Sequence, residues 1–353
     1  MILRIGIDGN GVLSIQTGGA VRVTDVDVAF GIGSDENALR ASPWDGFAGS
    51  GASEARWTFS RAVRDEVGAL ARLEVRQEGD VAWVSVEIER DLHGLAVADS
   101  FDQSRVAAPR LSIPPGLRAL SVSYGLGRSG EGQIGGYWPA GHSSASQSLP
   151  SGACAPLVLH DRHAALAIAP ANLFLTSALL PTQGGIARTL HGSVDALPEG
   201  TRIETALAAG QSVEEALWRL GDALLGRAGK ARPSPNDSPL TSTLGWWNAY
   251  GGYYTEPIRP LGESRLVEVI EVLRRQAVPI GYVGLDLWYP YRVIGQALRF
   301  APDRRKYARG FREIAEQSGL GFVLHLSALS ADNEYRTSGD DASFYTEVAA
   351  EIR

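Results

Sequence analysis

Aromatic, acidic and amide side chains recur at three places in the last third of the sequence, each time just after a short apolar run. Carboxylate and amide groups match the hydrogen-bonding groups of sugar hydroxyls, and an aromatic ring offers an apolar face on which a pyranose can stack. Together these residue types predict a carbohydrate-binding site. Its candidate residues are Trp247, Asn248, Tyr250, Asp286, Trp288 and His325.

The apolar runs that precede these residues have the length and composition of buried strands. They cover residues 244–250, 280–288 and 321–327, and helical patterns cover residues 263–276, 308–318 and a last stretch around 344–352. Apolar strands that alternate with helices are typical of a parallel sheet covered by helices. Because the carboxyl ends of parallel strands meet at one edge, we expect the candidate residues to lie together there.

Residues 240–353 are therefore predicted to be the N-terminal part of a (β/α)8 barrel. Three β/α units cannot close a barrel that needs eight strands, so we expect this chain to be part of a longer protein. An open parallel sheet would tolerate more trimming, but it would still leave the third strand as an unprotected edge.

Each main candidate also has an ordinary structural interpretation. Asp286 could cap the segment that follows it or pair with Arg292. Trp246 and Trp247 point to opposite faces of a strand, so one is expected in the core, and Trp247 is the choice for the barrel mouth. His325 fits a hydrogen-bonded barrel histidine as well as a ligand contact.

Residues 1–231 are predicted to form an antiparallel β-sandwich domain that ends in a helix over residues 212–228. One hairpin is expected with a turn at 78–80, and a second with a turn at 160–163. Ser212 and Glu215 have the spacing of a helix capping box. The proline-punctuated residues 232–239 are interpreted as a linker between the two domains.

Composition excludes several classes of function. The net charge of −7 argues against a nucleic-acid partner, and a single cysteine, Cys154, excludes an internal disulfide. The N-terminus alternates like a strand rather than a signal peptide, and no run reaches the roughly 18 apolar residues of a membrane span, so we expect a cytoplasmic protein without a membrane partner. His160 and His163 have zinc-like spacing but no further ligands beside them, so no metal site is predicted.

Residues 300–310, which read Phe-Ala-Pro-Asp-Arg-Arg-Lys-Tyr-Ala-Arg-Gly and precede a Gly-Leu strand start, form the most specific motif of the chain. With Gly245, Trp247, Asn248 and Tyr250 on the first strand and Asp286-Leu287-Trp288 on the second, this motif resembles the retaining α-glycosidases of glycoside hydrolase clan D. The resemblance is chiefly to family 36 α-galactosidases and their raffinose-synthase-like relatives, and more distantly to family 31 α-glucosidases.

Two departures from the family pattern leave the sugar open. The second strand ends in one aspartate, Asp286, where the galactosidases have two. The third strand ends in Leu324-His325-Leu326-Ser327, which is more similar to the raffinose-synthase-like group than to the Trp-x-Glu-Pro ending of many family 36 members. The resemblance therefore does not separate galactose from glucose, or hydrolysis from transglycosylation.

The resemblance implies a β-supersandwich ahead of the barrel and retaining hydrolysis of α-galactoside or α-glucoside linkages, with an oligosaccharide or glycoside as partner and no metal or cofactor. Two carboxylates carry out such a reaction in two steps. In the family they lie on strands four and six, beyond Arg353, so no catalytic residue is assigned here and we expect this chain alone to be inactive.

Two other functions stay open. The chain could belong to a non-catalytic carbohydrate-binding protein, or to an unrelated α/β enzyme in which the aromatic strand ends serve only as core. Homo-oligomer formation is also open, because an incomplete barrel would expose apolar strand surface.

Overall fold

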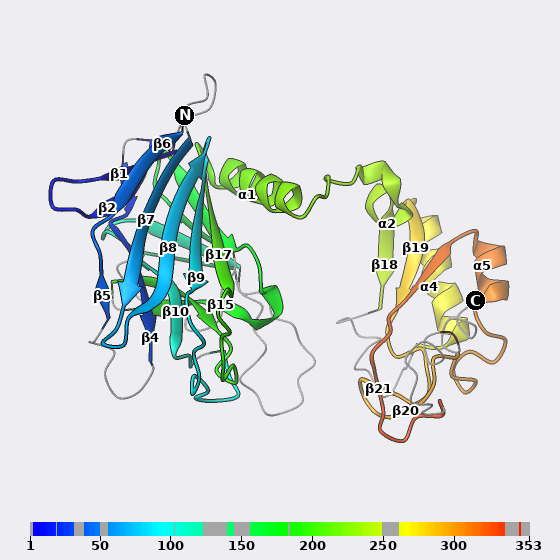
Figure 1. The fold of residues 1–353 in the computed structure, drawn as a ribbon. Helices are drawn as coiled ribbons and strands as arrows, with labels where there is room; N and C mark the ends of the chain where they lie inside the picture. The colour runs from blue at the N-terminus through cyan, green and yellow to red at the C-terminus, as the bar shows by residue number, and fades with distance from the viewer. Residues whose placement is uncertain are drawn as a thin grey trace. The chain divides into compact units, whose positions relative to one another are not determined.

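The computed structural model of the protein describes residues 3–18, 20–31, 39–49, 56–101, 103–122, 140–144, 156–182, 184–248, 261–335 and 346. The chain divides into two compact units, Met1–Arg232 and Pro233–Arg353, both drawn in Figure 1. Antiparallel strands build the first unit, and the second has parallel strands joined by helices. The sequence predicts this order of β structure followed by β/α structure.

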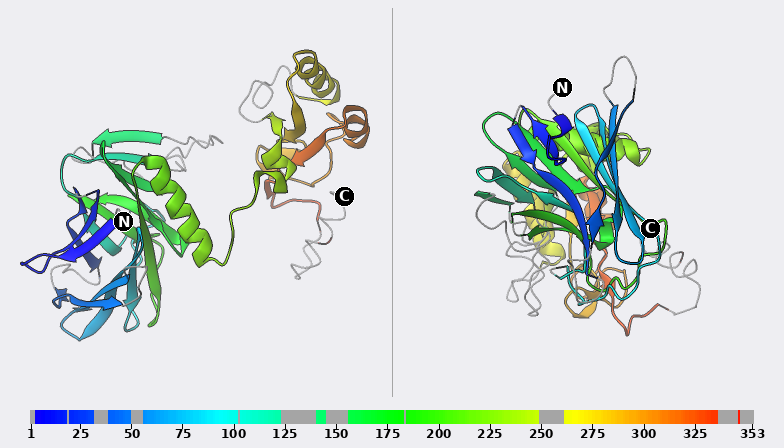
Figure 2. Two further views of the ribbon diagram at one scale, coloured as in Figure 1. Left: turned by 90° about the horizontal axis from the view of Figure 1, so that it is seen from above. Right: turned by 60° about the vertical axis from the view of Figure 1, so that its left-hand side comes forward.

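The first unit contains three antiparallel sheets within the described residues (Figures 1 and 2). A small sheet has the order β1-β2-β3, a second β15-β16-β10-β4, and the largest β12-β11-β13-β14-β17-β9-β8-β7-β5, with β6 also paired to β7. The strands are β1 (Leu3–Ile7), β2 (Leu13–Thr17), β3 (Ala20–Val23), β4 (Asp25–Phe30), β5 (Arg40–Ala41), β6 (Asp45–Gly49), β7 (Arg56–Arg64), β8 (Ala69–Glu78), β9 (Val81–Ile88), β10 (Val106–Ser112), β11 (Arg118–Val122), β12 (Ala140–Ser144), β13 (Leu157–His160), β14 (Ala165–Pro170), β15 (Ser177–Thr182), β16 (Gly185–Leu190) and β17 (Arg202–Gly210).

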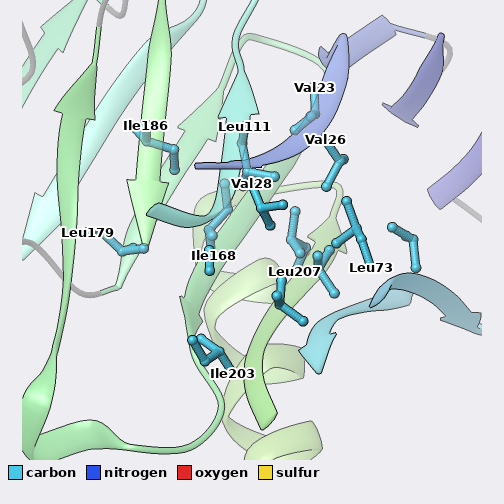
Figure 3. Packing of buried hydrophobic residues seen from close by; sticks show 14 of the residues in the cluster. Val23, Val26, Val28, Leu73, Leu111, Ile168, Leu179, Ile186, Ile203 and Leu207 are labelled. Atoms are coloured by element: carbon cyan, nitrogen blue, oxygen red, sulfur yellow. The ribbon is translucent and has the colours of Figure 1, made fainter. Parts of the chain in front are cut away.

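The main core of this unit lies between the second and the largest sheets (Figure 3). Val26 and Val28 on β4 are buried in one cluster with Leu73 on β8 and Leu207 on β17. Alternate side chains of a strand point to opposite faces, which is why the apolar residues of these strands recur at every second position. Face-to-face burial of this kind makes the two sheets a sandwich.

Both expected hairpins are confirmed, with small shifts at their turns. Strands β8 and β9 pair up to Glu78 and Val81, so the first turn is a tight one, and Gly79 adopts the positive φ of 59° that such turns require. Strands β13 and β14 pair up to His160 and Ala165, which places the second turn at residues 161–164.

Helix α1 (Val213–Arg227) covers the outer face of the largest sheet, over a strip of alanines on β14 and β17. Ser212 caps the helix by accepting a hydrogen bond from the Glu215 backbone N–H at 3.1 Å. The reciprocal bond predicted for the capping box goes elsewhere, because the Glu215 carboxylate accepts from the backbone N–H of Gln211, at 2.7 Å. Gly210, which precedes the cap, has no room for a side chain, since a Cβ there would stand 2.4 Å from the Ala216 backbone nitrogen.

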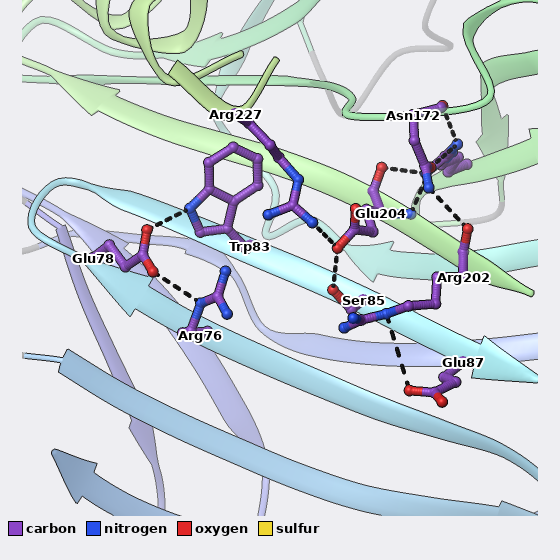
Figure 4. Close-up of polar contacts among 10 residues, drawn as sticks. Arg76, Glu78, Trp83, Ser85, Glu87, Asn172, Arg202, Glu204 and Arg227 are labelled. Carbon is purple, nitrogen blue, oxygen red and sulfur yellow. Dashed lines mark hydrogen bonds and ion pairs between the residues drawn. The ribbon is translucent and has the colours of Figure 1, made fainter. Parts of the chain in front are cut away.

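A line of polar groups runs from α1 through the largest sheet (Figure 4). Arg227 of α1 forms an ion pair with Glu204 of β17, and its guanidinium carbon lies 4.9 Å from the centre of the Trp83 ring. Ser85 donates to the same Glu204 carboxylate at 3.2 Å. From β16, the buried Arg188 donates to the Glu204 carbonyl, and its burial lowers its pKa to about 10.

The second unit has a parallel sheet of the order β18-β19-β22, as predicted. All three strands are shorter than expected, and α5 begins four residues late, after Gly310, whose φ of 81° does not suit a helix. A second small sheet, β20-β21-β23, was not expected. The elements are a 3-10 turn (Pro235–Asp237), α2 (Pro239–Ser242), β18 (Leu244–Trp247), α4 (Glu263–Arg275), β19 (Ile280–Leu285), β20 (Tyr291–Val293), β21 (Gln296–Ala297), α5 (Arg312–Ser318), β22 (Gly321–Leu324) and β23 (Ala328–Leu329).

One face of this parallel sheet carries the core of the unit. Val283 and Leu285 of β19 are buried with Leu266 and Ile270 of α4 and Ile314 of α5. In the described parts of the chain, no helix is long and apolar enough to cross a membrane. Cys154 and the helix expected around residues 344–352, apart from residue 346, lie outside the described residues.

Candidate functional site

The carboxylate of Asp286 is the meeting point of three strand ends. The indole Nε1 of Trp247 donates to Asp286 Oδ1 at 3.2 Å, and the imidazole Nδ1 of His325 lies 3.2 Å from the same oxygen. Trp247 closes β18, Asp286 follows β19 and His325 follows β22. The structure therefore brings these three predicted residues together at the carboxyl ends of neighbouring parallel strands.

The strand register explains why these three side chains share a face. Trp247 and Val323 both lie opposite Gly284 in the ladder, and Asp286 and His325 each follow two residues later on their strands. Since side chains at every second position of a strand point the same way, all three point to the face opposite the helices. The Asp286 residue is only 9% exposed, whereas Trp247 is 47% exposed and the His325 side chain 48%.

Glycine makes room for the aromatic rings on this face. A Cβ at Gly284 would stand 2.8 Å from Trp247 Cδ2, so the indole ring lies directly across the backbone of β19. Tyr282 lies in the same way across Gly245, where a Cβ would meet its ring at 2.1 Å. Each ring can therefore approach the backbone of the adjacent strand, because the residue that it meets there is a glycine.

Asn248 acts on the backbone rather than toward solvent. It is 3% exposed, its amide oxygen accepts from the Asp286 N–H at 2.7 Å, and its Nδ2 donates to the Asp286 carbonyl at 3.2 Å. This pair of bonds fixes the peptide groups on both sides of Asp286. The amide of Asn248 is thereby used within the protein, and we draw no sugar contact from it.

Trp288 is a core residue that supports His325. It is 1% exposed, and its indole N–H donates to the His325 carbonyl at 2.9 Å. The cause is Leu287, a non-glycine residue with φ of 52°, which turns the chain so that Trp288 does not continue on the face of Asp286. Tyr250, the remaining candidate, lies outside the described residues.

The structure also separates Asp286 from its alternative partner and adds a residue pair that the sequence did not reveal. Arg292 pairs with Asp332 and not with Asp286.

The buried Tyr289 donates its hydroxyl hydrogen to the Ser327 hydroxyl oxygen. Burial raises the pKa of Tyr289, and the charge of Asp286 raises it further against the effect of the Ser327 bond, so the hydroxyl stays a donor. The spacing of 38 residues between Tyr289 and Ser327 carries no sequence signal for this contact.

Two polar atoms at the site have no hydrogen-bond partner among the described residues. One is Asp286 Oδ2, since the Trp247 N–H donates to Oδ1, and the other is His325 Nε2 on the far side of the ring from Asp286. The described residues hold no group of three or more His, Cys, Asp and Glu side chains arranged for a metal ion. A carboxylate oxygen, an imidazole nitrogen and a half-exposed indole are suited to bind a polyhydroxylated ring.

Comparisons with known proteins support the fold. No protein-family model and no curated protein matches the sequence. Solved structures do match, at TM-scores just above 0.5, and they include a beta-arabinopyranosidase, with 11% identity over 99% of this chain and 58% of that protein and a TM-score of 0.56. A glycoside hydrolase family 97 enzyme from Pseudoalteromonas sp. strain K8, in complex with panose, matches with 9% identity over 91% of this chain and 52% of the enzyme, at a TM-score of 0.55.

A third similar structure is the ligand-free alpha-N-acetylgalactosaminidase NagBb from Bifidobacterium bifidum. It matches with 10% identity over 96% of this chain and 61% of the enzyme, at a TM-score of 0.52. The fold is that of the N-terminal portion of a glycoside hydrolase. At these identities the likeness concerns the fold alone, and the chain spans between half and two thirds of the length of these proteins.

Proposed function

We propose that this chain is the N-terminal portion of a retaining α-glycosidase and that Trp247, Asp286 and His325 bind the sugar of its substrate. In this proposal, residues 1–231 correspond to a β-supersandwich, residues 232–239 to a linker, and residues 240–353 to the opening β/α units of a (β/α)8 barrel. The whole protein hydrolyses or transfers α-galactoside or α-glucoside units. The fold shared with glycoside hydrolases and the resemblance of residues 300–310 to the clan D pattern support it.

The single observation that carries the proposal is the convergence of the Trp247 indole and the His325 imidazole on one oxygen of Asp286. Trp247 donates a hydrogen bond to Oδ1 and the His325 ring nitrogen Nδ1 lies 3.2 Å from the same oxygen, so Oδ2 keeps its capacity to accept hydrogen bonds from a ligand. An ionised carboxylate oxygen accepts charge-assisted hydrogen bonds, which are stronger than those between neutral groups. A fixed acceptor beside an exposed ring distinguishes one sugar hydroxyl arrangement from another.

The residues of this chain are proposed for binding and not for bond cleavage. Retaining hydrolysis needs a nucleophile and an acid/base whose carboxyl groups stand about 5–5.5 Å apart. We assign neither role to a residue of this chain. In this proposal the catalytic carboxylates belong to the rest of the whole protein. The strand ends described here bind the glycone and orient it for the reaction.

Sugar binding by the purified chain tests this proposal. Titration calorimetry with methyl α-D-galactopyranoside and methyl α-D-glucopyranoside should detect binding of at least one of the two. Asp286→Asn keeps the shape of the side chain but removes its charge, and we expect it to weaken that binding at least tenfold, about 1.4 kcal/mol. Asp332→Asn, in the same unit but paired with Arg292, serves as the matched control and should bind as the unaltered chain does.

Equal binding by the Asp286 and Asp332 variants would refute the assigned site. Binding that depends on Asp286, combined with a whole protein that does not cleave aryl α-glycosides, would favour the non-catalytic carbohydrate-binding alternative. Absence of binding to either glycoside would count against the sugar-binding role itself.

A further inference from the structure

The three backbone carbonyls that follow β19 are each bound by a donor from a distant part of the chain. The side-chain amide of Asn248 donates to the carbonyl of Asp286. The ammonium group of Lys306 donates to the carbonyl of Leu287 at 3.0 Å. The backbone N–H of Asp303 donates to the carbonyl of Trp288 at 2.8 Å. The turn that carries the Asp286 carboxylate is therefore held at every peptide.

The middle peptide of this turn is the one that needs support. Leu287 has a φ of 52°, a left-handed conformation that a leucine rarely adopts, and its side chain is buried in the core. Such a conformation persists only where the surroundings determine it. The bond from Lys306 to the Leu287 carbonyl is the contact from outside the turn that acts directly on this residue's own peptide oxygen.

Lys306 is itself held in place by its own loop. Its backbone N–H donates to the Asp303 carbonyl, and its carbonyl accepts from the N–H of Glu263 at the start of α4. The buried Asp303 carboxylate is bound by the Arg305 guanidinium, at 3.0 Å from Nε and 2.8 Å from Nη2. The Lys306 ammonium also lies 4.9 Å from the centre of the Tyr291 ring, so it sits between a carbonyl and an aromatic face.

This environment suits a compact ammonium group. Burial lowers the pKa of Lys306, and the nearby Asp303 carboxylate opposes that shift. A guanidinium could make the same two contacts, because arginine also donates to carbonyl oxygens and lies over aromatic faces. Lys306 and the exposed Lys230 are the only lysines of a sequence whose other cationic side chains, histidine aside, are arginines.

We propose that Lys306 is a positioning residue for the Asp286 site: by holding the Leu287 carbonyl, it fixes the left-handed turn that aims the Asp286 carboxylate at Trp247 and His325. This inference deepens the proposed function and rests on it for the sugar, but not for the geometry. It gives a role to the lysine of the residue 300–310 motif, whose ammonium group donates to the backbone carbonyl that follows Asp286 in the chain.

The variant Lys306→Met tests it, with Lys230→Met as the matched control. Methionine keeps most of the length and the apolar stem but cannot donate to the Leu287 carbonyl. In a chain labelled with 15N at tryptophan, the indole N–H signal of Trp247, assigned by its loss in Trp247→Phe, should shift in Lys306→Met and stay in place in Lys230→Met. The glycoside bound by the unaltered chain should bind Lys306→Met about tenfold more weakly, or 1.4 kcal/mol.

The conservative variant Lys306→Arg keeps a charged donor and should restore affinity to within about threefold of the unaltered chain. A purely structural lysine would lower the unfolding temperature without moving the Trp247 signal or the affinity of the folded variant, and that result would overturn the inference. Affinity of Lys306→Arg as low as that of Lys306→Met would also overturn it. Should Lys306→Met fail to fold, Lys306→Leu, which also has no side-chain donor, takes its place in both measurements.

The two measurements separate this inference from the proposed function. A shifted Trp247 signal without sugar binding in any variant, including the unaltered chain, would refute the sugar site but support the positioning role. Sugar binding that depends on Asp286, with an unchanged Trp247 signal in Lys306→Met, would support the sugar site and refute the positioning role.

Discussion

The indole ring of Trp247 lies across Gly284 of the neighbouring strand, where a Cβ atom would stand 2.8 Å from the ring. This close approach places the indole N–H within reach of Asp286, two residues further along the chain and just past the end of β19. The glycine is thus a geometric requirement of the site, although its own atoms make no polar contact with the carboxylate.

Substituting Gly284→Ala should displace the Trp247 ring and break its bond to Asp286. We expect a shifted indole N–H signal and a loss of sugar affinity of about tenfold, or 1.4 kcal/mol, measured by the same titrations. Gly321→Ala is the matched control on β22, because a Cβ there would lie 3.8 Å from its nearest neighbour, an ordinary contact. Similar losses in both variants would show that the sheet, and not the ring, was disturbed.

The buried Arg22 makes the first unit sensitive to the loss of Asp161. Its guanidinium is fully buried and donates to the Asp161 carboxylate at 2.9 Å. Asp161→Asn would leave that charge without its counter-ion, and we expect the free energy of unfolding to fall by about 3 kcal/mol in urea titrations. Glu87→Gln breaks an exposed pair with Arg202 and should cost less than about 0.5 kcal/mol. An equal effect of the two variants would contradict the importance of burial.

The same ion pair predicts how stability depends on pH. Hydrogen bonding from Arg22 holds the pKa of Asp161 well below its usual value, so the folded state binds the proton more weakly than the unfolded state does. The stabilisation is therefore complete above the unfolded value of about 3.9 and is lost as the pH falls through the folded one. Unfolding temperatures measured from pH 7 to pH 2 should fall below about pH 4, and less steeply in Asp161→Asn.

Two glycines near α1 should respond in opposite ways to the same substitution. Gly210→Ala would force a Cβ against the Ala216 backbone, and we expect a loss of about 2 kcal/mol in stability. Gly226→Ala, within α1 and with no atom within 4 Å of the added Cβ, should gain up to about 1 kcal/mol from helix propensity. Urea titration of both variants checks this, and a stable Gly210→Ala would show that α1 can move away from β17.

The sequence predicted the parallel strands and the convergence of Trp247, Asp286 and His325 because both follow from periodicity and from the direction of parallel strands. It could not predict that Trp288 is buried, since regular alternation places residues 286 and 288 on one face. The left-handed Leu287 breaks that alternation, and no local pattern marks a leucine for such a conformation. The roles of Asn248 and Lys306 could not be predicted from the sequence for a related reason. Both side chains bind backbone carbonyls, and such contacts leave no pattern in the sequence.

The small β20-β21-β23 sheet and the late start of α5 show the limit of pattern reading in short elements. A strand of two residues, such as Gln296–Ala297, has no periodicity to detect. The helix was expected from Ala308 because its apolar spacing extends that far, but Gly310 interrupts the backbone conformation. Tertiary contacts decide such boundaries.

Helix ends commonly fray, but fraying of the last turn of α1 would break the ion pair between Arg227 and Glu204. Arg227 neutralises Glu204, whose carbonyl is bound in turn by Arg188 from the opposite layer of the sandwich. Unwinding this turn would leave the Glu204 carboxylate, whose side chain is 10% exposed, without its counter-ion. Contacts of Glu204 thus link α1 with β17 and with β16 of the opposite sheet. The last residues of the first unit are therefore tied to its interior by the ion pair between Arg227 and Glu204.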